Sequence, residues 1–427
     1  MYKLLDRHIE WIVALGVVYI STLGMFRALM STLHATSIIR LLLYSSILIV
    51  GLLFWYQKRH FGVKIYDKFF FYFYLFYCLY VFLDMTVFRR YPLEDMLVVP
   101  SSLSLYFYNF IISLGYLACA PTIFHKFNLR KYVFLSLLMC TIPSVLFVRY
   151  VGVDIIQAGV GENDEEYIST LTVTFSNVPM LVIAVMNFKT LYIKKWLSII
   201  IATIIIASVL YVLFAFGKRG PMLWSVVNIM VCFFITSVNL RKYIFVLGLV
   251  VISFIALLDP IIEGISEVLP RTGQRMEMSL KEGETDGRFD LDDPKHSTYL
   301  IGLENFSRSP IWGYYFRLVT DYQQFKGAYS HNIFIEVLMT MGLIGFIPFM
   351  ILLIKAYNKS RKIFTKPYTA NQMAFFILFL CAFLQLQTSA TLLFRHYFWL
   401  FFYMLCCFDE LPLTSSKRLQ QNQIHYN

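Results

Sequence analysis

Residues 197–216 read LSIIIATIIIASVLYVLFAF, a stretch without a single charged side chain. An α-helix rises about 1.5 Å per residue, so this stretch is long enough to cross the roughly 30 Å hydrocarbon core of a bilayer. The bilayer core offers no water to the backbone, and a helix satisfies its own N–H and C=O groups. The stretch therefore predicts a transmembrane helix.

The same criterion of length and apolarity places about twelve transmembrane helices along the chain. The predicted spans are 9–26, 38–56, 69–88, 102–120, 132–150, 168–188, 197–216, 221–238, 243–258, 332–354, 372–393 and 395–408. We expect an all-α polytopic membrane protein with one large external loop that contains short helices. The expected parts are helices one to nine over 1–258, the loop over 259–331, helices ten to twelve over 332–410 and a cytoplasmic tail over 411–427.

The composition excludes a soluble globular enzyme. Of the 427 residues, 58% are hydrophobic and 15% are charged, whereas soluble domains have about 45–50% apolar and about 25% charged residues. Aromatic residues make up 18% of the chain, which suits a protein with aromatic belts at the membrane interfaces. All 7 cysteines lie inside apolar runs, so neither disulfide nor metal chemistry is indicated.

The net charge of +11 is an orientation signal and does not indicate nucleic-acid binding. Most Lys and Arg residues of the short loops fall on the side of the membrane that holds the N-terminus, which the positive-inside rule assigns to the cytoplasm. The acidic stretch Gly161–Glu166 falls on the opposite, external side. We therefore expect both termini in the cytoplasm and the loop 259–331 on the external, periplasmic or extracellular face of the membrane. A loop of that length without a function is uncommon.

Two apolar stripes at helical spacing predict short helices inside this loop. The first stripe is suited to lying on the membrane surface and the second follows a polar stretch, 272–294. Their members are Ile261, Ile262, Ile265, Val268 and Leu269 for the first, and Tyr299, Leu303 and Phe306 for the second.

The turn Gly217-Lys218-Arg219-Gly220-Pro221 carries two positive charges on the external side, where they are disfavoured. Arg219 stands beside the free N–H groups that begin the next helix. Two cations at a helix N-terminus favour a bound anion, and phosphate is the usual one. The alternative is that both side chains reach outward to lipid headgroups.

Arg288 lies in the large loop, in Asp286-Gly287-Arg288-Phe289-Asp290. A guanidinium can hold a phosphate with two parallel hydrogen bonds, but it could equally form a salt bridge with Asp286 or Asp290. The run Asp290–Asp293 offers carboxylates for a divalent metal, although such patterns are common in polar loops, and we expect no metal and no cofactor.

Ser330-His331-Asn332 stands where the loop enters the tenth span, and Glu336 follows at helical spacing. A neutral imidazole can accept the proton of a hydroxyl group, since histidine titrates near physiological pH. The alternative for His331 is a polar helix cap. Glu336 is an ionisable group just inside the bilayer, and such groups are functional hypotheses by default, whereas Asp84 in the third span is better explained as a structural ion-pair partner.

Aromatic residues gather before His331 and could stack on sugar rings or form an interfacial belt. We count Tyr329 among the candidate substrate-binding residues, together with Lys218, Asn332 and Glu336. The chain has no phosphate-binding loop, no dinucleotide fingerprint, no His-Glu-x-x-His motif and no nucleophile elbow, so covalent serine or cysteine catalysis has no support.

In combination, these motifs resemble those of the O-antigen ligase and Wzy-type O-antigen (polysaccharide) polymerase superfamily, over roughly residues 205–350. The resemblance is carried by the order and spacing of short motifs: Gly217–Gly220, Gly287-Arg288, Ser309-Pro-Ile-Trp-Gly313, Ser330–Glu336 and Met341-Gly-Leu-Ile-Gly345. In the acidic run after Arg288 the chain departs from many members, which continue into a Trp-containing helix.

The resemblance implies a metal-independent, inverting membrane glycosyltransferase. It implies that Arg219 and Arg288 hold the pyrophosphate of an undecaprenyl-linked glycan, and that His331 acts as general base or orients the acceptor hydroxyl. It also implies a bacterial cell-membrane location, with a chain-length regulator and a flippase as candidate partners and no nucleic acid.

Among related activities we favour a polysaccharide polymerase over a ligase that transfers glycan to a lipid or protein. A polysaccharide flippase or other transporter is the alternative from another class. Transporters usually have internal repeats, and none is visible in this sequence.

Overall fold

The computed structural model describes residues 2–32, 36–83, 103–151, 164–192, 194–236, 258–270, 272–274, 277, 297–314, 330–364, 368–387, 392 and 396–408. Within these residues all regular structure is helical and no strand occurs, which confirms the predicted all-α class. Asp84, Arg288, the run Asp290–Asp293 and Tyr329 lie outside the described residues, as does all of the span predicted at 243–258 except its last residue.

In each of the other predicted spans, the residues that the structure describes are mostly helical. The helices that overlap the predicted spans or directly adjoin them are α1 (Tyr2–Thr32), α2 (Thr36–His60), α3 (Lys68–Leu83), α4 (Leu103–Ala118), α5 (Ala120–Lys126), α6 (Leu129–Ser136), η3 (Leu137–Thr141), α7 (Ile142–Val151), α9 (Asp164–Met186), α10 (Lys195–Phe216), α11 (Arg219–Thr236), α16 (Ile333–Phe364), α17 (Ala370–Gln385) and α18 (His396–Cys407). The two loop helices also form, as α13 (Leu258–Val268) and α15 (Thr298–Arg308).

Three helical stretches of the described part are long and apolar enough to cross a membrane alone: Leu129–Tyr150, Lys195–Phe216 and Ile333–Phe364. The first of them is α6 and α7 joined through the π-helical turn η3. Shorter apolar helices such as α3, α11 and α17 complete a bundle of membrane-protein composition.

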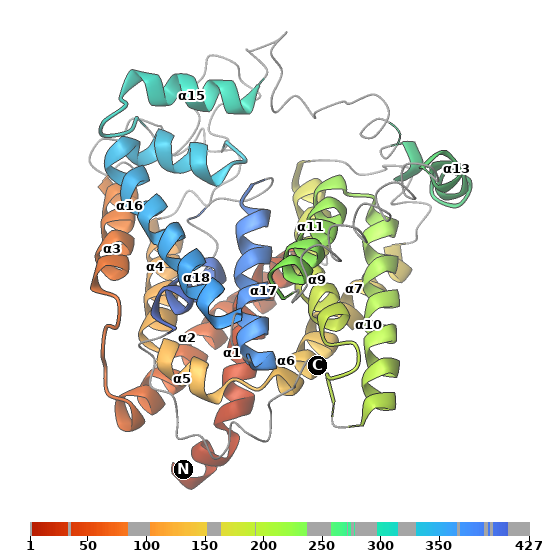
Figure 1. Ribbon diagram of the computed structural model, residues 1–427, viewed down its shortest axis with the longest axis horizontal. Helices are drawn as coiled ribbons and strands as arrows, with labels where there is room; N and C mark the ends of the chain where they lie inside the picture. Colours follow the sequence, from red (N-terminus) through yellow and green to blue (C-terminus); the bar gives the residue numbers. More distant parts are fainter. Residues whose placement is uncertain are drawn as a thin grey trace.

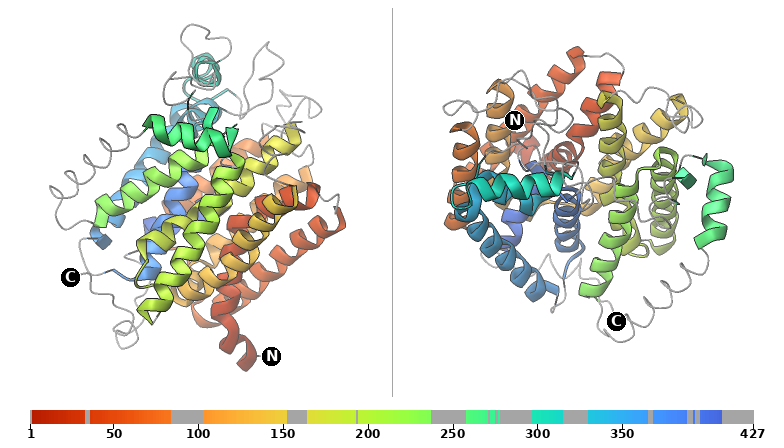
Figure 2. Two further views of the ribbon diagram at one scale, coloured as in Figure 1. Left: turned by 90° about the vertical axis from the view of Figure 1, so that its right-hand side faces the viewer. Right: turned by 90° about the horizontal axis from the view of Figure 1, so that it is seen from above.

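The helices run side by side in one bundle (Figures 1 and 2). α1 packs on α9, α2 and α6, and α10 packs on α9. α17 lies inside the bundle, in contact with α11 on one side and α18 on the other. The loop helices sit at one end of the bundle, α15 over α16 and α13 at the rim beside α10 (Figures 1 and 2). We call this the loop end.

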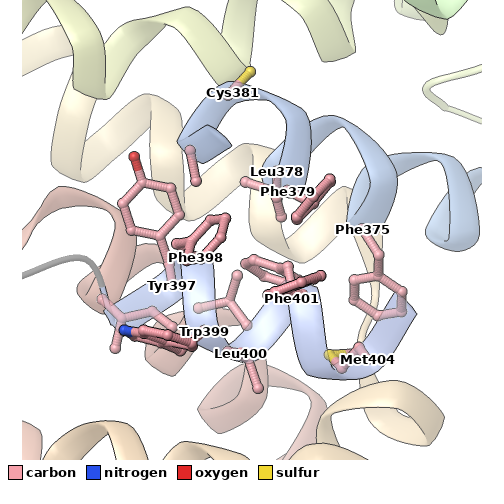
Figure 3. Packing of buried hydrophobic residues seen from close by; sticks show 14 of the residues in the cluster. Phe375, Leu378, Phe379, Cys381, Tyr397, Phe398, Trp399, Leu400, Phe401 and Met404 are labelled. Atoms are coloured by element: carbon pink, nitrogen blue, oxygen red, sulfur yellow. The ribbon is translucent and has the colours of Figure 1, made fainter. Parts of the chain in front are cut away.

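α18 is buried on all sides and organises the core. Every side chain from Tyr397 to Phe408 is buried, as expected of a helix that is apolar all round. Its rings interleave with those of α17, with centroid separations of 5.8 Å for Phe379–Phe398 and 5.9 Å for Phe375–Phe401 (Figure 3). Because all of these side chains are buried, protein surrounds α18.

Polar side chains tie the helices together at the end opposite the loop end. Asp67, 3% exposed in its side chain, accepts a hydrogen bond from the Phe70 N–H at the start of α3 and forms an ion pair of 2.6 Å with Lys355 of α16. The Gln57 side chain accepts hydrogen bonds from the N–H and the hydroxyl of Thr122. These contacts join helices that lie far apart in the sequence.

Replacing Asp67 tests this end of the bundle. Asp67→Ala removes both the helix cap and the ion pair, and we expect it to lower the free energy of unfolding by about 1–3 kcal/mol. Asp67→Asn keeps an oxygen for the Phe70 N–H and should lose less. Thermal unfolding in detergent measures the difference, and equal melting temperatures for Asp67→Ala and the wild type would contradict the assignment.

Candidate functional site

The turn between α10 and α11 presents a buried cation at the loop end. Gly217 ends α10 with left-handed backbone angles (φ 56°, ψ 32°), and its N–H bonds to the carbonyls of Leu213 and Phe214. Glycine adopts this conformation without strain, which is why it ends so many helices. Lys218 follows and is only 7% exposed, and α11 begins at Arg219. Protein atoms therefore cover Lys218, which does not fit an outward-reaching side chain. The backbone of Arg219 is described, whereas its side chain is outside the described part.

The large loop packs directly onto this turn. The Thr272 hydroxyl donates a hydrogen bond of 2.9 Å to the Phe214 carbonyl at the end of α10. A Cβ atom on Gly217 would come within 2.4 Å of the Thr272 oxygen and 3.2 Å of its Cα. The glycine thus serves both the helix end and the close approach of the loop, and the sequence alone had given no role to Thr272.

His331 occupies a special backbone position at the start of α16. Among the described non-glycine residues it alone has a positive φ, 55°. Such a conformation costs free energy and is typical of positions held for function. On one side the Ser330 hydroxyl donates to the Asn332 carbonyl at 3.0 Å. On the other side the Asn332 side chain caps α16, since its oxygen accepts hydrogen bonds from the N–H groups of Phe334 and Ile335. The capping residue is therefore Asn332, and His331 stands just outside the helix.

α16 is broken at Gly342, which the predicted uninterrupted span over 332–354 missed. Gly342 has φ 59° and ψ −158°, a region of backbone space that is essentially restricted to glycine. The part of α16 before Gly342 lies across the direction of the longer part that follows (Figure 1). The Gly-rich motif in an apolar helix was the signal that could have indicated the break.

The segment 310–314 of the large loop fills this break. The N–H groups of Leu343 and Ile344 donate to the carbonyls of Pro310 (2.9 Å) and Ile311 (3.2 Å), and the Tyr314 N–H donates to the Met339 carbonyl (2.7 Å). Backbone groups that α16 leaves without helical partners are thereby satisfied by the loop.

This contact needs a glycine on both of its segments, Gly313 in the loop and Gly342 in α16. A Cβ on Gly342 would lie 2.4 Å from the Ile311 carbonyl oxygen, and a Cβ on Gly313 would lie 2.1 Å from that of Thr340. The motifs Ser309–Gly313 and Met341–Gly345 are thus two sides of one structure, which we call the α16 joint. The Tyr80 hydroxyl donates to the Trp312 carbonyl at 2.8 Å and attaches the joint to α3.

Glu336, in the first turn of α16, is 1% exposed, and one of its carboxylate oxygens accepts a hydrogen bond from the Leu392 N–H at 3.1 Å. Leu392 belongs to the connection between α17 and α18. The rings of Phe334 and Phe383 also meet across this contact, with centroids 5.9 Å apart. The beginning of α16 therefore lies against the end of α17.

Residues 204–350 match the protein family described as O-antigen ligase. They carry an O-antigen ligase domain. No curated protein matches the chain.

The O-antigen ligase domain contains every candidate site residue that the sequence indicated. It includes Lys218 and Arg219, the loop helices α13 and α15, His331 and the α16 joint, whereas α1 to α9, α17 and α18 lie outside it. The match over 204–350 implies a glycosyl-transfer enzyme of the ligase or polymerase type, in polysaccharide biosynthesis.

Within the described residues, two parts of the O-antigen ligase domain pack against α17. α11, which begins at Arg219, packs on α17, and the start of α16 packs on the end of the same helix. No group of three or more His, Cys, Asp or Glu side chains suited to a metal ion occurs among the residues that were described.

Gly342→Ala tests the α16 joint. The added Cβ meets the Ile311 carbonyl in a conformation that alanine avoids, so we expect a loss of about 1–3 kcal/mol in the free energy of unfolding, measured by thermal unfolding in detergent. Gly264→Ala in α13 is the matched control, because a Cβ there meets nothing within 4 Å. A Gly342→Ala protein as stable as the Gly264→Ala control would contradict the described geometry.

Thr272→Val tests the contact of the loop with the α10–α11 turn. The substitution keeps the shape of the side chain and removes the hydroxyl, and we expect it to weaken the contact by about 1 kcal/mol. Limited proteolysis should then cut the loop 259–331 faster than in the wild type, while Thr272→Ser should behave like the wild type. Equal cleavage rates for the valine and serine variants would rule the hydrogen bond out as a fastening.

Proposed function

We propose that this protein is a bacterial cell-surface polysaccharide polymerase. It transfers a glycan from undecaprenyl pyrophosphate onto an incoming lipid-linked repeat unit, with inversion and without a metal ion. The observation that carries the proposal is the covered Lys218 in a turn of the O-antigen ligase domain, with the large loop packed against it.

The donor pyrophosphate is proposed to bind at the α10–α11 turn. Free N–H groups at the start of a helix attract phosphate, and Lys218 and Arg219 add positive charge where α11 begins. Arg288 is proposed to reach the same phosphates from the loop. Displacement at the anomeric carbon leaves negative charge on the pyrophosphate, and preorganised cations in a dry site stabilise that charge effectively. Since pyrophosphate is already a good leaving group, no metal is required.

His331 is proposed to accept the proton of the attacking hydroxyl or to orient that hydroxyl. Its strained backbone position at the edge of α16 supports this role, because strain of this kind is commonly retained at functional sites. Tyr329 and Asn332 are proposed to contact the glycan. The side-chain oxygen of Asn332 caps α16, so its amide NH₂ group is the part proposed to contact the glycan.

The acceptor distinguishes the proposed polymerase from the ligase alternative, in which the glycan moves to a lipid or protein. Both activities use the same donor. A flippase, the alternative from another class, would move the lipid-linked glycan without breaking a bond. We place the site on the external face of the bacterial cell membrane, both termini in the cytoplasm, and a chain-length regulator and a flippase among the partners.

Purified protein supplied with its lipid-linked oligosaccharide tests the proposal. The donor can be extracted from a host strain that lacks the gene and accumulates the unit. We expect polymer, formed equally with and without a chelator. Arg219→Ala, Arg288→Ala and His331→Ala should each reduce polymer formation at least about 100-fold with normal protein levels.

Arg361→Ala is the matched control, because Arg361 is an exposed arginine in the last turn of α16, and it should leave the rate unchanged. Wild-type polymer lengths in the three site variants would refute the assignment. Transfer to a different acceptor would identify a ligase, and translocation without bond cleavage would identify a transporter.

A further inference from the structure

Three side chains form hydrogen bonds with the connection between α17 and α18 or with the residues that flank it. Tyr299 of α15 donates to the Gln387 carbonyl at 3.2 Å, and Tyr397 at the start of α18 donates to the Gln385 side chain at 2.6 Å. Glu336 of α16 accepts from the Leu392 N–H at 3.1 Å. These contacts come from α15 inside the large loop and from α16 and α18, which follow the loop.

Among the described residues of this connection, Leu392 is held through both of its backbone groups. Its side chain is fully buried, its N–H donates to Glu336, and its carbonyl accepts a hydrogen bond of 3.0 Å from the indole N–H of Trp399. A buried backbone group without a partner costs free energy, and Glu336 removes that cost for the Leu392 N–H by accepting its hydrogen bond.

Glu336 joins this connection to the helix that presents His331. Glu336 belongs to the short part of α16 before the break at Gly342, which begins two residues after His331, and the Asn332 carbonyl accepts the Glu336 N–H at 2.8 Å. On its other side, α17 packs on α11, the helix that follows Lys218. α17 therefore contacts both the part of α16 that carries Glu336 and the helix that follows Lys218.

We propose that Glu336 is a positioning residue that acts through Leu392, and that it neither takes a proton nor contacts the glycan. It fixes the start of α16 against the α17–α18 connection and so sets the place of His331 relative to the α10–α11 turn. This inference rests on the proposed function for its catalytic consequence, although the fastening itself does not.

Glutamine separates this role from acid–base chemistry. Its side-chain oxygen can accept the Leu392 N–H as the carboxylate does, whereas it cannot act as a base. Glu336→Gln should thus keep both the fastening and the activity, and Glu336→Ala should lose both. Trp399→Phe, which removes the donor to the Leu392 carbonyl and retains the aromatic ring, should have an intermediate effect.

Two measurements on the purified full-length protein test the inference. In hydrogen–deuterium exchange, a peptide covering 386–396 should exchange faster in Glu336→Ala than in the wild type, and at the wild-type rate in Glu336→Gln. With the extracted lipid-linked oligosaccharide as donor, Glu336→Ala should lower kcat about 10- to 100-fold with little change in KM. Glu304→Gln on the exposed face of α15 is the control and should change neither quantity.

An inactive Glu336→Gln with normal exchange would overturn the inference, because the charge itself would then be required. Unchanged exchange in Glu336→Ala would overturn it as well. If Glu336→Ala does not fold, the comparison of Glu336→Gln with Trp399→Phe decides. If the wild type transfers no glycan, the proposed function fails while the exchange data still test the fastening.

Discussion

The α16 joint is the constraint on which the rest of the loop end depends. A helix that breaks among apolar neighbours leaves N–H and C=O groups that must find partners, and here the segment 310–314 provides them through Pro310, Ile311 and Tyr314. The exchange works because Gly313 and Gly342 let two backbones approach without a Cβ between them. One set of hydrogen bonds therefore bends α16 and anchors the large loop.

Because of the bend, the two parts of α16 run in different directions. The first part of α16 runs across the end of the bundle, and the longer part descends along α3 and α18 (Figure 1). The first part carries Glu336 and begins two residues after His331. On the other side, Thr272 attaches the loop to the turn that holds Lys218. The loop is thus fastened at both of its described ends, and α17 fills the space between the helices that begin at Arg219 and Ile333.

The sequence was sufficient to predict where the helices lie, but not the break in α16 or the contacts between distant segments. Runs such as 197–216 have no charge, and hydropathy alone locates them as helices. The break at Gly342 escaped because a glycine inside an apolar run is compatible with a continuous helix, and only the approach of Ile311 explains it. Glu336 was recognised as an unusual buried acid, but its partner is a backbone N–H 56 positions further along the chain, and no local pattern reports such a contact. The same holds for Thr272 and Phe214.

The central claim is that the phosphates of a lipid-linked donor bind where α11 begins, on the side of α17 opposite the start of α16. A cryo-electron microscopy structure of the protein with the extracted lipid-linked oligosaccharide tests this directly. We expect phosphate density within hydrogen-bonding distance of Lys218 or the first N–H groups of α11, with the sugar directed toward His331. Phosphate density at the end of the bundle that holds Asp67 and Lys355, or a donor whose sugar points away from His331, would contradict the claim.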